Sequence, residues 1–117
     1  MRNYRELVAW QVAFELARRT YLLTGEFPKS EVFGLVSQMR RCAVSIASNL
    51  AEGAGRTTSK DFSHFVSIAR GSLNELETQY LLVKELGFCA VDESYSEMIE
   101  RLFALINGLR NSLNAQR

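Results

Sequence analysis

The chain has little of what catalytic and metal-binding proteins use most: its 117 residues include one histidine and two cysteines. His64 has neither a nearby cysteine pair nor a carboxylate four residues before or after it, and Cys42 and Cys89 lack the spacing of metal ligands. No apolar run approaches the roughly 20 residues that cross a bilayer, and the first residues lack the apolar core of a secretion signal. The sequence therefore predicts a cytoplasmic protein that is not an enzyme, uses no cofactor and does not enter a membrane.

Neither sign of charge predominates, since the formal net charge is only +1. Residues 1–60 nevertheless carry nine Lys or Arg against five acidic residues, whereas residues 61–117 carry five against eight. Such an imbalance is more typical of complementary helix faces, within or between chains, than of a nucleic-acid-binding surface. With 47% hydrophobic and 23% charged residues, the composition is that of a soluble globular protein, and the length suits one domain over residues 1–117.

The apolar residues recur at steps of three and four throughout the chain, which is the period of a helix. Four segments show this pattern and are expected to be helical: about residues 4–24, 31–53, 59–86 and 92–115. Asn3 with Glu6 forms a capping pair for the first helix, and Thr58 with Asp61 forms a start signal for the third. Short connections between long helices favour antiparallel neighbours. The sequence therefore predicts an all-α fold, an up-down-up-down antiparallel four-helix bundle.

The segment SIASNLAEGAGR, residues 45–56, has the small residues and glycines of a phosphate-binding loop. Such a loop follows a β-strand and opens a helix, whereas these glycines follow a helical pattern. We therefore interpret Gly53 or Gly55 as the end of the second helix, in the left-handed conformation that glycine adopts without steric cost.

A stripe of polar residues recurs at helical spacing along the second predicted helix. An antiparallel neighbour would bring Arg41 toward Glu75 or Glu77 of the third helix, where opposite charges would meet. We interpret the stripe as a solvated or inter-helix ion network, with a ligand or RNA site as the alternative that stays open. The residues of this network are Arg41, Ser45, Asn49, Glu52, Arg70, Glu75 and Glu77.

Glu52 lies in the last turn of its helix, where the helix dipole disfavours an anion. We therefore expect it to pair with a cation, either Arg56, Lys60 or Arg70. Gly71 lies in the middle of the third helix at a cost of about 1 kcal/mol relative to alanine, which suggests close packing or another benefit at that position.

The segments QMRRCAVSIASNLAEG and IARGSLNELETQYLLVKELGF, with FPKSEVFGL before them, resemble the four-helix bundle family associated with intervening sequences in bacterial 23S rRNA genes. The resemblance covers nearly the whole chain. It implies the fold, and a related branch is more informative about function. The accessory variability protein of diversity-generating retroelements is similar in fold, is a homopentamer, and binds a reverse transcriptase and nucleic acid. The positions that carry the resemblance are Arg41, Ser45, Asn49, Glu52, Gly53, Arg70, Gly71, Ser72, Glu75 and Glu77.

Two classes of function stay open. The first is a homo-oligomeric scaffold that binds RNA or an RNA-handling partner, and the second is an interaction module that binds only protein. The large apolar residues exceed what one bundle interior needs, which favours self-association in either case. Few aromatic residues lie among the exposed cations in the sequence, so RNA binding is expected to be led by shape and charge rather than by base stacking. The candidate RNA contacts are Arg40, Arg56, Lys60 and Arg70.

Overall fold

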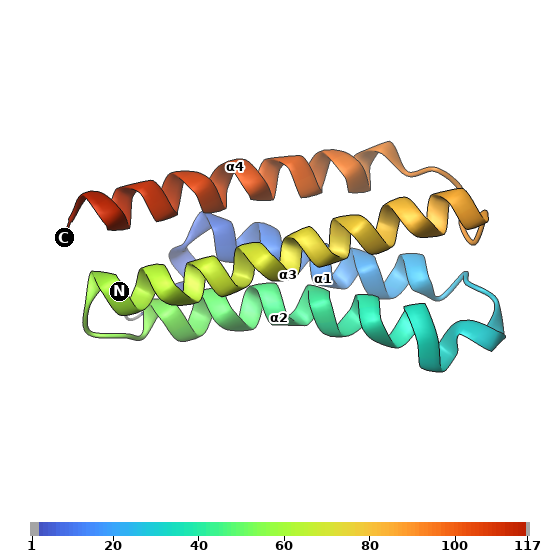
Figure 1. Cartoon of the computed structure of the whole chain (residues 1–117), viewed down its shortest axis with the longest axis horizontal. Helices are drawn as coiled ribbons and strands as arrows, with labels where there is room; N and C mark the ends of the chain where they lie inside the picture. Colours follow the sequence, from blue (N-terminus) through green and yellow to red (C-terminus); the bar gives the residue numbers. More distant parts are fainter. Residues whose placement is uncertain (1–2, 117) are drawn as a thin grey trace.

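The computed structural model describes residues 3–116, which form four α-helices: α1 (Val8–Thr24), α2 (Ser37–Ala54), α3 (Ser59–Leu86) and α4 (Glu93–Ala115). Successive helices run in opposite directions along an elongated bundle of 46 × 23 × 20 Å (Figure 1). Each helix packs on two others, since α1 and α3 both contact α2 and α4. The all-α, four-helix fold predicted from the sequence is therefore confirmed, and the described residues contain no strand. None of these helices is long and apolar enough to cross a membrane.

The core runs along the axis of the bundle and is built from the periodic apolar positions, of which Leu16 and Ile106 are fully buried examples. Two buried tyrosines, Tyr80 and Tyr95, close the core near the turn between α3 and α4, with ring centroids 4.7 Å apart. The Tyr95 hydroxyl lies 2.7 Å from the hydroxyl of Thr20. This hydrogen bond supplies the partner that a buried hydroxyl needs.

The first helix begins later than the sequence pattern predicts. The side chain of Asn3 accepts a hydrogen bond from the N–H of Arg5 (3.1 Å) and so caps a short 3₁₀ turn, Tyr4–Glu6. α1 itself starts at Val8, where no side chain caps it. The predicted capping pair therefore stabilises the turn that precedes the helix.

The connection between α1 and α2 contains a 3₁₀ turn, Lys29–Glu31, and a π-helical turn, Val32–Val36, which is kinked at Gly34 (φ −106°, ψ −114°). The carboxylate of Glu31 accepts a hydrogen bond from the N–H of Leu35 (3.4 Å) and so caps the π-helical turn. Phe33 lies in this turn with 97% of its surface exposed, which places a large aromatic ring almost entirely in solvent.

The ends of α3 and the start of α4 follow local sequence signals. Thr58 accepts a hydrogen bond from the N–H of Asp61 (3.1 Å), as predicted for the start of α3. Gly87 ends the same helix in the left-handed conformation, with φ of 71°. Asp92 caps α4 by accepting a hydrogen bond from the N–H of Tyr95 (3.1 Å).

Candidate functional site

The turn between α2 and α3 depends on a close approach of the two helices. A Cβ atom at Gly53 would lie 2.8 Å from Cβ of Phe65 and 3.0 Å from the ring of Phe62, so only glycine fits there without a shift. α2 continues through Gly53 to Ala54, and Gly55 caps it with right-handed backbone angles (φ −84°, ψ −4°). The predicted end of the helix at Gly53 or Gly55 is confirmed at Gly55, but the predicted left-handed conformation is wrong. Gly53 lies within the helix, where it allows the close packing.

Arg56 follows this turn and is held between an acid and an aromatic ring. Its Nη2 donates to Oε1 of Glu52 (2.7 Å), and its Cζ atom lies 4.7 Å from the centre of the Phe65 ring. The predicted pairing of Glu52 with a cation is thus confirmed, and the partner is Arg56. The exposed ring of His64 lies 5.7 Å from Phe65 at an interplanar angle of 75°. The sequence gives no sign of this cluster, since Arg56 and Phe65 meet only because the chain turns between them.

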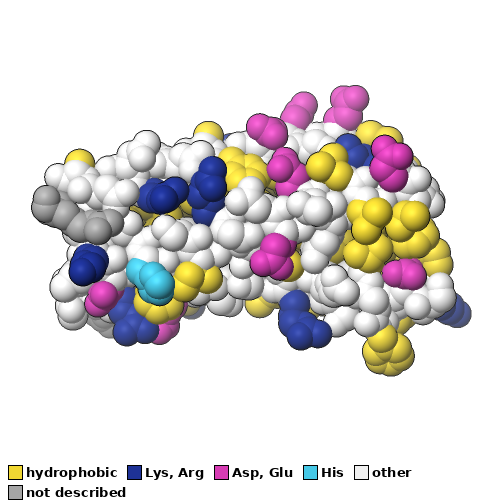
Figure 2. All heavy atoms as spheres, in the orientation of Figure 1, with side chains coloured by type: hydrophobic (Ala, Val, Ile, Leu, Met, Phe, Trp, Pro, Cys, Tyr) yellow, Lys and Arg dark blue, Asp and Glu magenta, His cyan; other side chains and the backbone are white. Residues whose placement is uncertain are grey.

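The cations at this turn are matched by an equal number of acids. Arg56 and Lys60 are accompanied by Glu52 and Asp61, and all four side chains are exposed. The Lys60 side chain is exposed and makes none of the ion pairs found in the described range 3–116, so its charge is available to a ligand. Figure 2 shows the single histidine of the chain on the surface beside a hydrophobic group and near basic and acidic side chains. Within the same range, no group of three or more His, Cys, Asp or Glu is placed to hold a metal ion.

In the described part of the chain, the polar stripe of α2 meets α3 through hydrogen bonds rather than ion pairs. The hydroxyl oxygens of Ser45 and Ser72 are 3.0 Å apart, and Nδ2 of Asn49 donates to the carbonyl and hydroxyl oxygens of Ser45 (2.8 and 3.0 Å). The thiol of Cys42 donates to the carboxylate of Glu75 (3.5 Å). Burial raises the pKa of the Cys42 thiol, and the nearby Glu75 carboxylate raises it further, so the thiol stays protonated.

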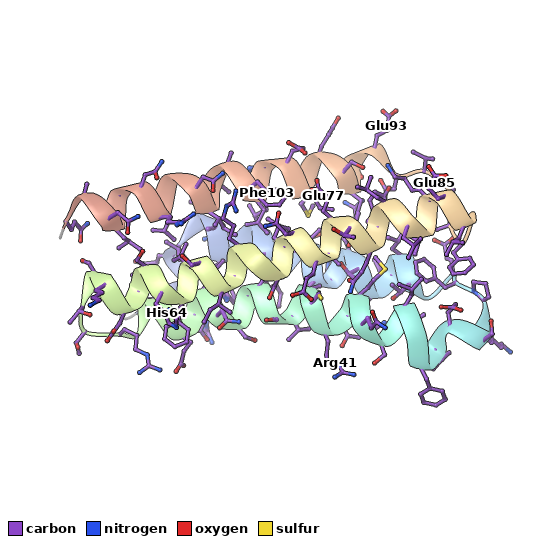
Figure 3. The ribbon with its side chains drawn as sticks, viewed as in Figure 1. Arg41, His64, Glu77, Glu85, Glu93 and Phe103 are labelled. Atoms are coloured by element: carbon purple, nitrogen blue, oxygen red, sulfur yellow. The ribbon has the colours of Figure 1, made fainter. Side chains whose placement is uncertain are left out.

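The predicted ion pair between Arg41 and a carboxylate of α3 does not form among the described residues. Arg41 is exposed and donates only to the hydroxyl of Ser37 (3.4 Å). Figure 3 shows Arg41 outside α2 and Glu77 between α3 and α4, and Glu75 accepts from a thiol instead. Side chains of successive residues in an α-helix point about 100° apart around the helix axis. Arg41 precedes by one residue the side chains that face α3, so it points toward solvent instead.

The four predicted RNA contacts do not form one surface. Arg40 faces α1, where its guanidinium lies 4.5 Å from the centre of the Tyr21 ring and donates to the Tyr21 carbonyl (3.2 Å). Arg70 faces α4, where Nε donates to Oδ1 of Asn107 (2.8 Å) and the guanidinium lies 5.8 Å from the Phe103 ring. The remaining two predicted contacts stay together at the α2–α3 turn.

A second surface, along α2 and its neighbours, combines exposed apolar side chains with polar and charged ones. A groove of about 850 Å³ extends from Phe33 along α2 to Val44 and includes Arg41. A smaller hollow of about 290 Å³ lies between α1 and α2, where Trp10 and Phe14 form one wall. Phe14 is 56% exposed and Val44 43%, which agrees with the excess of large apolar residues noted in the sequence.

We compared the sequence with known proteins and protein families. A search of curated proteins found no match. A family model described as 23S rRNA-intervening sequence protein matches residues 5–111. The matched range begins in the turn before α1, contains α1, α2, α3 and the α2–α3 turn, and ends within α4. The chain therefore belongs to the family of 23S rRNA-intervening sequence proteins.

Proposed function

We propose that the protein is a non-enzymatic, self-associating scaffold of the cytoplasm that binds RNA at the α2–α3 turn. Membership in a family named for 23S rRNA supports an RNA-related role. The observation that carries the proposed site is the exposed cluster of Arg56, Lys60 and His64 at one end of the bundle. Cations beside aromatic rings are the usual means of holding an RNA chain without a deep pocket.

One copy of this surface offers too few cations for tight binding at physiological salt, so the proposal requires several copies on one assembly. Linked copies raise the effective concentration of each later contact and lift the overall affinity by roughly 10²- to 10⁴-fold. The resemblance noted in the sequence suggests five copies. A head-to-tail contact between different faces closes such a ring.

The charge distribution favours contact between unlike faces. Figure 2 shows acidic side chains gathered over the end of α3 and the start of α4, and the sequence of α4 begins with Glu93, Glu97 and Glu100. Arg40 and Arg41 of α2 line the groove that begins at Phe33. A contact of the α2 face with itself would oppose like charges, whereas a contact with the acidic face of the next copy would pair opposite ones.

The proposed function is tested by titrating a structured RNA with the wild-type protein and the double variant Arg56→Glu, Lys60→Glu across a salt series. We expect the double variant to bind more weakly and with a shallower dependence on salt, since each lost phosphate contact removes roughly one power of salt concentration. Arg101→Glu is the control, because it reverses the charge of an exposed cation on α4, outside the proposed site. Absence of wild-type binding at about 50 mM salt, or an unchanged double variant, would refute the RNA site.

The second candidate is a module that binds only protein, including a protein similar to a reverse transcriptase. The exposed Phe33 and the groove that it lines favour this function, because exposed aromatic rings are frequent anchors of protein interfaces. A module that binds only protein would show no RNA binding in the same titration, which separates the two candidates.

A further inference from the structure

We propose that the α2–α3 turn binds an unpaired RNA base by stacking it on the guanidinium plane of Arg56. The ligand class is then single-stranded RNA or a loop with exposed bases. This inference rests on the proposed RNA-binding function and specifies its ligand, and it replaces the expectation from the sequence that binding is led by shape and charge.

Two contacts within the protein orient the guanidinium of Arg56. One face lies over the ring of Phe65, with Cζ 4.7 Å from the ring centre, and one edge donates to Glu52 (2.7 Å). The Arg56 side chain is still 44% exposed, so a flat ligand has access to it. An ordered plane loses less conformational freedom on binding than a free side chain, and bases stack on guanidinium planes as they do on aromatic rings.

The ring beneath Arg56 is itself anchored in the bundle. Phe65 is half-buried and packs against Gly53, where a Cβ atom would approach within 2.8 Å. The exposed His64 ring stands edge-on to Phe65 at 5.7 Å and offers a second surface for a neighbouring base or ribose. Figure 3 shows His64 on the side of α3 near α2, at the same end of the molecule as the turn. Two flat groups are therefore placed around one fixed ring.

The charges at the turn favour base stacking over binding by phosphate contacts alone. Glu52 offsets the charge of Arg56 through a direct ion pair, and Asp61 follows Lys60 in the sequence. A site built to bind phosphates would present unpaired cations. Here the planarity of Arg56 is what remains available to a ligand, and Lys60 supplies a phosphate contact beside it.

The test compares two RNA probes by fluorescence anisotropy with the full-length protein: an unstructured single strand of about ten nucleotides and a blunt duplex of the same composition. Wild-type protein should bind the single strand more tightly at equal salt. Arg56→Lys keeps the charge and removes the plane, so affinity for the single strand should fall roughly 5- to 100-fold while the salt slope stays the same. His64→Ala should weaken single-strand binding, and His64→Phe should restore it.

Controls and outcomes separate this inference from the proposed function. Arg101→Lys on α4 makes the same chemical change at an exposed arginine outside the cluster and should leave the affinity unchanged. Equal wild-type binding of both probes, or an Arg56→Lys protein that binds the single strand like wild type, would overturn stacking while leaving RNA binding in place. Failure of the wild type to bind either probe would remove both proposals. Circular dichroism of each variant verifies that the bundle is folded.

Discussion

The hydroxyl of Ser45 on α2 lies 3.0 Å from the hydroxyl of Ser72 on α3, at the helix contact where the sequence predicts an ion network. Both side chains are half-buried, and Asn49 donates a further hydrogen bond to the Ser45 oxygen. Short hydroxyl side chains let two helices approach closely. Neutral hydrogen bonds also avoid the desolvation penalty that a buried ion pair carries. At Ser45 and Ser72 the contact between α2 and α3 is thus polar without being charged.

Replacing these serines should reveal coupling between them. We expect Ser45→Ala and Ser72→Ala each to lower the free energy of unfolding by about 1–2 kcal/mol, with Ser45→Ala the larger because Asn49 also loses an acceptor. The double variant should lose less than the sum, by about 1 kcal/mol. Urea unfolding of the four proteins measures this, and strictly additive losses would mean that the two hydroxyls do not interact.

Arg41 provides the contrasting case on the same helix. Because its side chain is exposed and donates only to Ser37 (3.4 Å), Arg41→Ala should cost less than about 1 kcal/mol in unfolding free energy. The same urea experiment measures it. A loss of roughly 3 kcal/mol or more would indicate a buried partner and contradict the position described for Arg41.

Two glycines should respond in opposite directions to the same substitution. Gly53→Ala places a methyl group 2.8 Å from Phe65 and should destabilise the protein by about 1–3 kcal/mol. At Gly71 nothing lies within 4 Å of an added Cβ, so the close packing considered for this position is absent. Gly71→Ala should therefore stabilise the helix by about 0.5–1 kcal/mol. Thermal unfolding of the two variants measures whether each substitution raises or lowers the stability. Equal changes in stability would contradict the difference in packing between the two glycines.

Stability should fall in acid partly because of Asp92. A hydrogen bond from Ser94 lowers the pKa of the Asp92 carboxyl, and the N–H of Tyr95 and the guanidinium of Arg19 lower it further. Since the folded-state pKa lies below the unfolded one, the stabilisation is present at neutral pH and is lost as the pH falls below about 4. Asp92→Asn keeps the shape of the side chain and removes its charge.

This variant should therefore be less stable than wild type by about 0.5–1 kcal/mol at pH 7, and the difference should vanish near pH 2. Denaturant midpoints measured at several pH values test the expectation. Glu100→Gln, at an exposed position of α4, serves as the matched carboxylate control. A difference between wild type and Asp92→Asn that does not change with pH would show that the charge of Asp92 contributes nothing.

Phe33 is expected to anchor the contact between copies. Phe33→Ser should weaken self-association by roughly tenfold or more, since burying an aromatic ring contributes about 1.5–3 kcal/mol. The unfolding free energy of the isolated chain should not change, because the ring is 97% exposed. Light scattering over a concentration series measures the effect. Val91→Ser, at a residue 69% exposed in the α3–α4 connection, is the control, and an unchanged mass for Phe33→Ser would place the contact elsewhere.

Features that depend on neighbouring residues were predictable from the sequence. The start of α3 at Thr58 and the pairing of Glu52 with Arg56 both involve residues within one helical turn of each other. The position of Arg41 was not predictable, because it depends on how α2 is rotated about its own axis. Polar or small residues occur both on the solvent side of α2 and on the side that faces α3, so the pattern does not fix this rotation. The role of Gly53 depends on the distance between two helices, which no local pattern reports.

The bundle has an even number of antiparallel helices, so both ends of the described chain lie at the same end of the molecule as the α2–α3 turn (Figure 1). An affinity tag or fluorophore on either terminus would stand near Arg56 and would itself compete with a ligand for space. A label in the α1–α2 connection sits at the far end of a 46 Å long axis. Energy transfer between that label and labelled RNA would thus report which end of the bundle the nucleic acid occupies, with the termini left free of added groups.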